Sequence, residues 1–297
     1  MHYVRLKQVI ARHSHYASLA NLSSLLLRTV SLAVLLSAAS LASAGPQLTV
    51  FDCGKLNFES ITAFGLGDDA TEVRELFVPC YLIQHEKGLL LWDFGLPLEI
   101  AGAGKIDLQP GSWMQYDRSL LQQLKKLALT PDDISFIAPS HMHFDHVGAI
   151  SAFPKATLLI ANKEYTAAFE NAESNTFYDL SLYASVADNP RVLLDDDYDV
   201  FGDGTVMIIP APGHTPGHQV LLVRLANTGT VLLSGDLYHF EASVEKHAIP
   251  EFNTDPAQTR ASMDKIETLL KTETATLWIE HNMALANSLE LAPASYD

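Results

Sequence analysis

Three histidines and one aspartate lie within six consecutive residues of this chain, at His141, His143, Asp145 and His146. Imidazole nitrogen and carboxylate oxygen are ligands that suit zinc, iron or manganese. Because alternate residues of an extended segment project to one side, His141 and His143 can bind one ion. Asp145 and His146 follow where the chain turns into the next element, and they can reach a second ion nearby. The cluster therefore predicts a two-metal site.

Three further candidate ligands each follow an apolar segment that is typical of a buried strand. They are His214 after residues 206–210, Asp236 after residues 230–233, and His281 after residues 276–279. Proline and glycine around His214 predict a rigid loop that aims one ligand. A carboxylate at a strand end can place one oxygen on each of two cations, so we interpret Asp236 as a bridging ligand. His218, in the same loop as His214, is expected to support that loop by hydrogen bonding.

The remaining pattern predicts an α/β fold that fills one domain over residues 45–297. The predicted strands include residues 134–138, directly before the metal cluster, and a hairpin formed by residues 78–84 and 89–93. The predicted helices cover residues 116–129, 162–170 and 255–271. We interpret residues 96–115 as a long irregular segment that forms a lid or a pocket wall. His85 is expected to be a solvated residue of the hairpin turn, and Asp195-Asp196-Asp197 a solvated turn.

The first 44 residues have the layout of a secretory signal peptide. Four basic residues and no acidic residue accompany the apolar segment 30–41, and Ala42-Ser43-Ala44 forms a small-residue cleavage site. The apolar segment is too short for a comfortable membrane span; an uncleaved anchor is the alternative. We therefore predict a periplasmic or secreted protein with no stable membrane insertion after signal cleavage.

Cleavage after Ala44 makes the chain more acidic. It removes four of the 19 basic residues and none of the 35 acidic residues, so the formal net charge changes from −16 to −20. A surface of this charge repels phosphate backbones, which disfavours nucleic acid and favours a small-molecule substrate.

Cys53 and Cys80 would meet an oxidising compartment after export. They form either a disulfide or a pair of buried free thiols.

The order and spacing of the candidate ligands resemble the metallo-β-lactamase superfamily. The resemblance rests on His141-x-His143-x-Asp145-His146, Gly213-His214-Thr215-Pro216-Gly217-His218, Gly235-Asp236 and His281, and it covers essentially the whole chain after residue 44. It implies an αββα sandwich. Within the superfamily the sequence is most similar to N-acyl homoserine lactonases, which are dinuclear metallohydrolases. That similarity implies His141, His143 and His214 on the first metal, Asp145, His146 and His281 on the second, and Asp236 between them.

The resemblance also implies a mechanism of lactone hydrolysis. Two divalent ions about 3.5–4 Å apart would hold a bridging water and lower its pKa toward 7. The resulting hydroxide would attack the lactone carbonyl, while Asp236 carries a proton to the leaving oxygen. We expect zinc, with iron, cobalt or manganese as alternatives.

One position departs from the lactonase pattern. Many lactonases have a tyrosine three residues after the bridging aspartate, whereas this chain has His239 there and Tyr238 one residue earlier. Neighbours in an extended segment face opposite sides, so only one of the two can contact a substrate oxygen. The candidate catalytic residues are therefore Asp236, Asp145, Tyr238 and His239.

Other functions use the same ligand set. Phosphotriester hydrolysis is an open alternative. A thioesterase of the glyoxalase II kind would be expected to have a longer helical C-terminal segment, and β-lactam hydrolysis is disfavoured because those zinc enzymes usually lack the Asp145-His146 pair. An iron-dependent oxidoreductase and a non-catalytic exported binding protein are alternatives from other classes, but the complete ligand set favours catalysis. The oligomeric state is open, with a homodimer as one option.

Overall fold

The computed structural model describes residues 45–174 and 177–297. The predicted signal peptide, residues 1–44, lies outside the described residues, so its cleavage stays a prediction. Within the described part of the chain, no helix is both long and apolar enough to cross a membrane.

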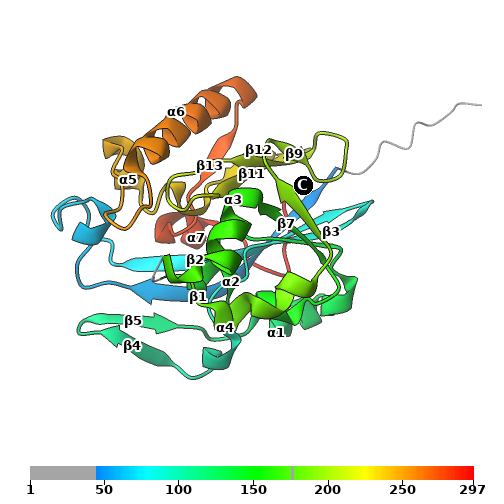
Figure 1. Ribbon diagram of the computed structural model, residues 1–297, viewed down its shortest axis with the longest axis horizontal. Coiled ribbons are helices and arrows are strands. Elements are labelled where there is room, and N and C mark those ends of the chain that lie inside the picture. The colour runs from blue at the N-terminus through cyan, green and yellow to red at the C-terminus, as the bar shows by residue number, and fades with distance from the viewer. Residues whose placement is uncertain (1–44, 175–176) are drawn as a thin grey trace, which may run out of the picture. The chain divides into compact units, whose positions relative to one another are not determined.

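Two mixed β-sheets form the centre of the fold (Figure 1). The larger sheet has eight strands in the order β4-β5-β1-β2-β3-β6-β7-β8, and the smaller has five in the order β13-β12-β11-β10-β9. The strands of the larger sheet are β1 (Gln47–Asn57), β2 (Glu75–His85), β3 (Gly88–Trp92), β4 (Lys105–Gln109), β5 (Ser112–Gln115), β6 (Phe136–Ala138), β7 (Thr157–Ala161) and β8 (Arg191–Leu194). Those of the smaller sheet are β9 (Tyr198–Asp199), β10 (Val206–Pro210), β11 (Gln219–Leu225), β12 (Gly229–Leu233) and β13 (Thr276–Trp278).

Helices surround the two sheets. They are α1 (Leu120–Lys126), α2 (Phe144–Val147), α3 (Asn162–Tyr165), α4 (Leu180–Tyr183), α5 (Glu241–Lys246), α6 (Pro256–Glu273) and α7 (Met283–Ser288). Helix α7 packs through Met283 and Leu285 on the cluster between the sheets. Helix α6 begins with an N-cap at Asp255, whose side chain accepts a hydrogen bond from the backbone N–H of Gln258, and with a proline in its first turn.

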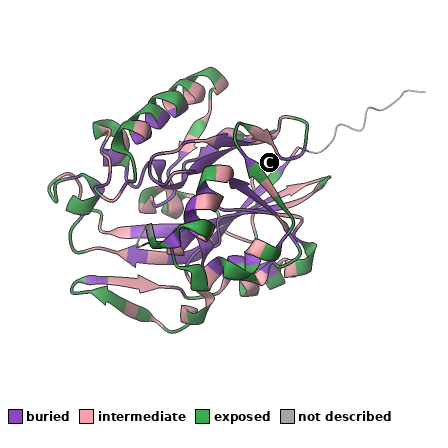
Figure 2. Ribbon diagram, viewed as in Figure 1, coloured by how far each residue is buried: buried purple, intermediate pink, exposed green. Residues whose placement is uncertain are grey.

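The period-two pattern of the strands explains why the two sheets pack face to face. Val50 of β1 and Leu221 of β11 lie in one buried cluster between the sheets. Their neighbours Phe51 and Leu222 point the other way, into separate clusters on the outer faces. The outer cluster of the smaller sheet is closed by α6 through Ile266. Buried residues accordingly concentrate on the strands, while the far side of α6 is exposed (Figure 2). The predicted αββα sandwich is confirmed.

We expected the segment 96–115 to be irregular, but it contains the β4–β5 hairpin. Strand β5 pairs with β1 through Met114 and Leu56, so the hairpin extends the larger sheet at its edge. Its strands are mostly half-buried or exposed and polar, as is typical of edge strands. An apolar pattern therefore could not reveal them. The predicted helix 116–129 is confirmed only over the shorter α1, and β8, α5 and α7 were not predicted.

His85 is not the solvated turn residue that we expected. Its side chain is 1% exposed and its Nε2 lies 2.9 Å from an Asp203 carboxylate oxygen. Its ring stacks on Phe201 with 4.2 Å between centroids. The segment 199–205, which is remote in sequence, therefore covers the hairpin turn.

Cys53 and Cys80 form a disulfide that links β1 to β2. The two strands are paired antiparallel, and Cys80 lies opposite Phe51 in the register. The Cα atoms of the two cysteines are 5.8 Å apart, within the range of ordinary disulfides. Of the two alternatives for these cysteines, the structure therefore has the disulfide.

Candidate metal centre

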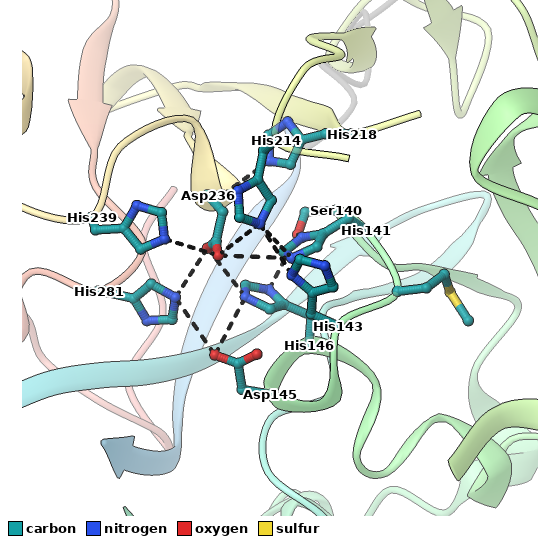
Figure 3. Close-up of polar contacts among 12 residues, drawn as sticks. Ser140, His141, His143, Asp145, His146, His214, His218, Asp236, His239 and His281 are labelled. Carbon is teal, nitrogen blue, oxygen red and sulfur yellow. Dashed lines mark hydrogen bonds and ion pairs between the residues drawn. The ribbon is translucent and has the colours of Figure 1, made fainter. Parts of the chain in front are cut away.

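The candidate ligands gather where four strands end (Figure 3). Each of β6, β10, β12 and β13 is followed within four residues by a ligand: His141, His214, Asp236 and His281 respectively. Backbone hydrogen bonds hold this region together: the N–H of Gln219, at the start of β11, donates to the carbonyl of Ser140 after β6 at 2.9 Å, and the N–H of Ser234 after β12 donates to the carbonyl of Trp278 in β13 at 3.0 Å. The sheet architecture therefore brings together residues that lie up to 140 positions apart in the sequence.

Three imidazoles and one carboxylate oxygen form the first group. His214 Nε2 lies 3.2 Å from His141 Nε2 and 3.1 Å from His143 Nδ1. Asp236 Oδ2 lies 3.3 Å from His214 Nε2 and 3.7 Å from His141 Nε2. Ligand atoms about 2.0–2.1 Å from a tetrahedral zinc ion are about 3.3 Å from one another. The four atoms therefore have the spacing that a tetrahedral metal requires.

Asp145, His146 and His281 form the second group. Asp145 Oδ2 lies 3.8 Å from both His146 Nε2 and His281 Nε2. Asp236 Oδ1 lies 3.2 Å from His146 Nε2 and 3.0 Å from His281 Nε2. The two oxygens of Asp236 thus point to different groups, which is the geometry of a bridging carboxylate.

The ring nitrogens that face away from the centre are held by other groups. His214 Nδ1 lies 2.8 Å from Asn253 Oδ1, and His281 Nδ1 lies 2.7 Å from the carbonyl oxygen of Phe77. His146 Nδ1 lies 3.2 Å from Asp93 Oδ2. His141 Nδ1 lies 3.0 Å from Ser140 Oγ. Such partners fix the orientation and tautomer of metal-binding histidines. They leave Nε2 of each ring directed at the centre, and Nε2 of His146 is buried there without a hydrogen bond within the described residues.

The electrostatics of the centre suit cations. Burial and the neighbouring imidazoles hold the pKa of His141 and His143 well below the ordinary value, so both rings are neutral and carry free lone pairs. Burial alone would raise the pKa of Asp236, but the surrounding histidines outweigh it and hold that pKa well below its usual range. Burial opposes protonation of His146, yet Asp236, Asp145 and Asp93 raise its pKa well above normal. The raised pKa favours protonated His146 in metal-free protein, and this ring must lose a proton when Nε2 binds a metal.

His218 supports the ligand loops, as predicted. Its Nδ1 lies 3.0 Å from the carbonyl oxygen of Ala211, and its Nε2 accepts a hydrogen bond from the backbone N–H of Asp236 at 2.9 Å. Burial lowers the pKa of His218 to about 3. The ring is therefore neutral, with the tautomer that donates to Ala211 and accepts from Asp236.

The two candidates after the bridging aspartate face opposite sides. His239 Nε2 lies 3.1 Å from Asp236 Oδ2, and the His239 ring stacks on His281 at 5.5 Å. Tyr238 instead lies in the buried cluster under α6, where its hydroxyl donates to Glu267 Oε1 at 3.2 Å. Tyr238 is therefore outside the site, and His239 occupies the position from which a side chain can reach a substrate.

A cavity of about 370 Å³ opens at the metal centre. Its floor includes His143, Asp145, Asp236, His239 and His281. Its walls are mainly apolar and aromatic: Leu56, Phe58, Phe64, Leu76, Leu108, Phe144, Phe177 and Phe252. Leu108 belongs to the β4–β5 hairpin, so the segment 96–115 does form a pocket wall, as expected.

Sequence reasoning missed three polar residues around the centre. Asn253 orients His214, and Asp93 contacts both His146 and the backbone N–H of Ser140, at 2.6 Å. Glu280 is buried beside Asp93, and burial together with that neighbouring acid raises its pKa well above the ordinary value. The position of Asp93, an acid at the end of an apolar strand, was a signal for its role. No sequence pattern around the loop residue Asn253 indicates that it contacts His214.

Comparisons with known proteins agree with this architecture. The profile of the Metallo-beta-lactamase superfamily matches residues 73–277. N-acyl homoserine lactonase AttM of Azorhizobium caulinodans is 32% identical over 240 residues, which cover 75% of this chain and 88% of that protein. N-acyl homoserine lactonase AiiA of Bacillus thuringiensis subsp. kurstaki is 27% identical over 223 residues, which cover 72% of this chain and 84% of that protein.

Solved structures share the fold. An N-acyl homoserine lactone hydrolase with the product N-hexanoyl-L-homoserine at its catalytic metal centre aligns with a TM-score of 0.72 and 23% identity, over 86% of this chain and 100% of that one. The dizinc quorum-quenching lactonase AidC aligns with a TM-score of 0.61 and 19% identity, over 86% and 95% of the two chains. Because the superfamily profile spans more than half of the sequence and a relative above 30% identity covers 75% of it, the chain belongs to the metallo-beta-lactamase superfamily and, within it, to the N-acyl homoserine lactonase-like metal-dependent hydrolases.

Proposed function

We propose that this protein hydrolyses the ester bond of N-acyl homoserine lactones and so performs quorum quenching, with two divalent metal ions, expected to be zinc, at the histidine and aspartate centre. The observation that carries the proposal is a single cavity with the ligand groups at its floor and an apolar wall around them. Such a cavity suits a small polar ring attached to a hydrocarbon chain. The relatives named N-acyl homoserine lactonase support the same substrate class.

The donor set fits two metals, with His141, His143 and His214 on the first, Asp145, His146 and His281 on the second, and Asp236 between them. When bound, such ions supply a strong nucleophile at neutral pH and polarise a carbonyl oxygen. Nitrogen and oxygen donors at tetrahedral spacing make zinc our expectation.

The chain's own residues then have distinct tasks. The aromatic wall holds the acyl chain and excludes water from it, through side chains such as Phe64, Phe144 and Phe252. Asp236 lies at the floor of the cavity and can pass a proton to the leaving ring oxygen. His239 Nε2 lies 3.1 Å from Asp236 Oδ2 at the floor, so the tautomer with its hydrogen on Nε2 can donate to oxygen atoms there. The product is the ring-opened N-acyl homoserine.

A substrate panel tests the proposed reaction. Purified protein of measured metal content is incubated with N-acyl homoserine lactones of several chain lengths, with a thioester and with a phosphotriester, and the products are followed by mass spectrometry. We expect lactone opening to be the fastest reaction. Hydrolysis of the thioester or phosphotriester without lactone opening, by protein that contains both metals, would reject the proposed substrate.

We also propose that the mature protein is periplasmic or secreted. The Cys53–Cys80 disulfide supports this location, since disulfides persist in oxidising compartments. N-terminal sequencing of protein from the native cell is expected to give a mature end at or near Gly45. An intact Met1 on protein from the soluble cytoplasm would contradict the proposal.

Light scattering of the purified protein tests whether it is a homodimer.

A further inference from the structure

Glu164, in the first turn of α3, is a buried carboxylate outside the ligand set. Its Oε1 accepts a hydrogen bond from the backbone N–H of Met142 at 2.9 Å, and its Oε2 accepts one from the backbone N–H of Gly217 at 3.0 Å. The hydroxyl of Tyr178 also donates to Oε1, at 3.1 Å. Each carboxylate oxygen therefore contacts a different loop.

Both loops carry ligands of the first metal. Met142 lies between His141 and His143, and Gly217 follows His214 by three residues. Tyr178 adds a third connection, because its backbone forms a β-bridge with His143. The hydrogen bonds of Glu164 thus connect the two loops that supply all three imidazoles of the first group.

The chemistry of the contact requires a carboxylate. All three partners of Glu164 are donors, and a carboxylate presents acceptors on both of its oxygens, whereas a carboxamide presents one acceptor and one donor. A buried carboxylate is costly unless it is hydrogen-bonded. The loop also packs directly on α3, since a Cβ atom on Gly217 would lie 2.3 Å from the backbone nitrogen of Glu164. The distance between α3 and this loop therefore has little freedom to change.

We propose that Glu164 is a positioning residue for the first metal, which sets the spacing between the loop of His141 and His143 and the loop of His214. That spacing keeps the ligating nitrogens 3.1–3.2 Å apart. This role rests on the proposed function in one respect: the first ligand group must bind a metal. The second group takes Asp145 and His146 from the first of these loops but no ligand from the loop of His214, so the spacing that Glu164 sets matters for the first site.

Zinc binding in two single-site backgrounds tests this specificity. His281→Ala leaves the first ligand group intact, and His143→Ala leaves the second. Glu164→Gln is added to each, and the zinc dissociation constant is measured by competition with a chromophoric chelator. In the first background, Glu164→Gln should weaken zinc binding about 10- to 100-fold, as is usual when a supporting partner of a metal ligand is lost. In the second, the dissociation constant should stay unchanged.

Lys163→Gln is the matched control, since Lys163 is the exposed neighbour of Glu164 on the same helix. It should leave zinc binding unchanged in both backgrounds. Equal weakening at both sites, or none at the first site, would overturn the proposal and leave Glu164 as a core residue. If Glu164→Gln does not fold, Glu164→Asp decides, because it keeps the charge but is too short to reach both loops. Zinc binding is measured without substrate, so the result is independent of whether lactones are hydrolysed.

Discussion

The Nε2 atom of His239 lies 3.1 Å from Oδ2 of Asp236, the residue three positions earlier in the chain. Asp236 is surrounded by imidazoles of both ligand groups, and His239 adds one more ring that is not needed to complete either group. The same ring lines the cavity, next to an aromatic wall residue, Phe64, at 5.0 Å between centroids. His239 is therefore placed between the bridging carboxylate and the substrate cavity.

The first prediction concerns His239. His239→Ala should lower kcat for lactone opening by on the order of a hundredfold, because a preorganised donor to a developing oxyanion typically contributes that much. Both metals should stay bound, as measured by elemental analysis. Tyr238→Phe is the matched control and should have a near-normal rate, since its hydroxyl contacts Glu267 away from the cavity. A metal-replete His239→Ala variant with a near-normal rate would remove the proposed role.

The second prediction concerns the bridging carboxylate. Asp236→Asn should lose more than about 1.4 kcal/mol of transition-state stabilisation, which is a tenfold loss in kcat/KM. The reason is that a carboxamide keeps only one acceptor oxygen, so it can serve only one of the two ligand groups, and the proton carrier is lost as well. Steady-state kinetics and metal analysis of the variant measure both effects. If the variant keeps more than about a tenth of wild-type kcat/KM, Asp236 does not combine these roles.

How far the sequence could predict this protein depends on the range of the contacts involved. The ligand-bearing strand ends were predictable, because each combines a local apolar segment with a polar ligand, as at residues 134–138 before His141. Alternation also predicted that Tyr238 and His239 face opposite sides. Which of them faces the cavity depends on the packing of α6 around Tyr238, and that contact is distant in sequence.

The same limit explains the incorrect expectations. The burial of His85 depends on Phe201, a residue more than 100 positions away, so no local pattern could reveal it. The β4–β5 hairpin is a strand pair at the edge of the larger sheet, and edge strands lack the apolar pattern that identifies buried ones. Long-range packing, rather than local propensity, decides both features.

The third prediction concerns the disulfide. The bond closes a loop with a sequence separation of 27 residues, for which loop-closure entropy gives a stabilisation of about 3.5 kcal/mol. Cys53→Ala combined with Cys80→Ala should therefore lower the free energy of unfolding by a few kcal/mol, in the range of about 2–4. Urea unfolding of this variant and of the wild type, with and without reductant, measures the effect. Two titratable thiols in oxidised wild-type protein would contradict the bond.

The fourth prediction concerns Glu280 in metal-free protein. Burial and the adjacent Asp93 raise its pKa well above the ordinary glutamate value of 4.5. Between the ordinary and the raised pKa, the folded state binds more protons than the unfolded state, so the free energy of unfolding falls as pH rises, by up to about 1.4 kcal/mol per pH unit. Glu280→Gln should remove this component of the pH dependence and leave the protein more stable than the wild type above that interval.

Urea unfolding of metal-free protein over a pH series measures this difference. Glu245→Gln, an exposed acid on α5, is the control and should keep the wild-type pH dependence. Parallel stability curves for wild type and Glu280→Gln would show that Glu280 titrates alike in the folded and unfolded states. That outcome would contradict the raised pKa.

We expect lactone hydrolysis to require two metal ions at the centre, with Asp236 between them. The most direct test is to remove all metal with a chelator, add zinc stepwise, and measure opening of an N-acyl homoserine lactone together with bound zinc per chain. We predict that metal-free protein is inactive and that the rate rises with zinc until two ions are bound per chain. An undiminished rate in metal-free protein, or no lactone opening with two zinc ions bound, would contradict this expectation.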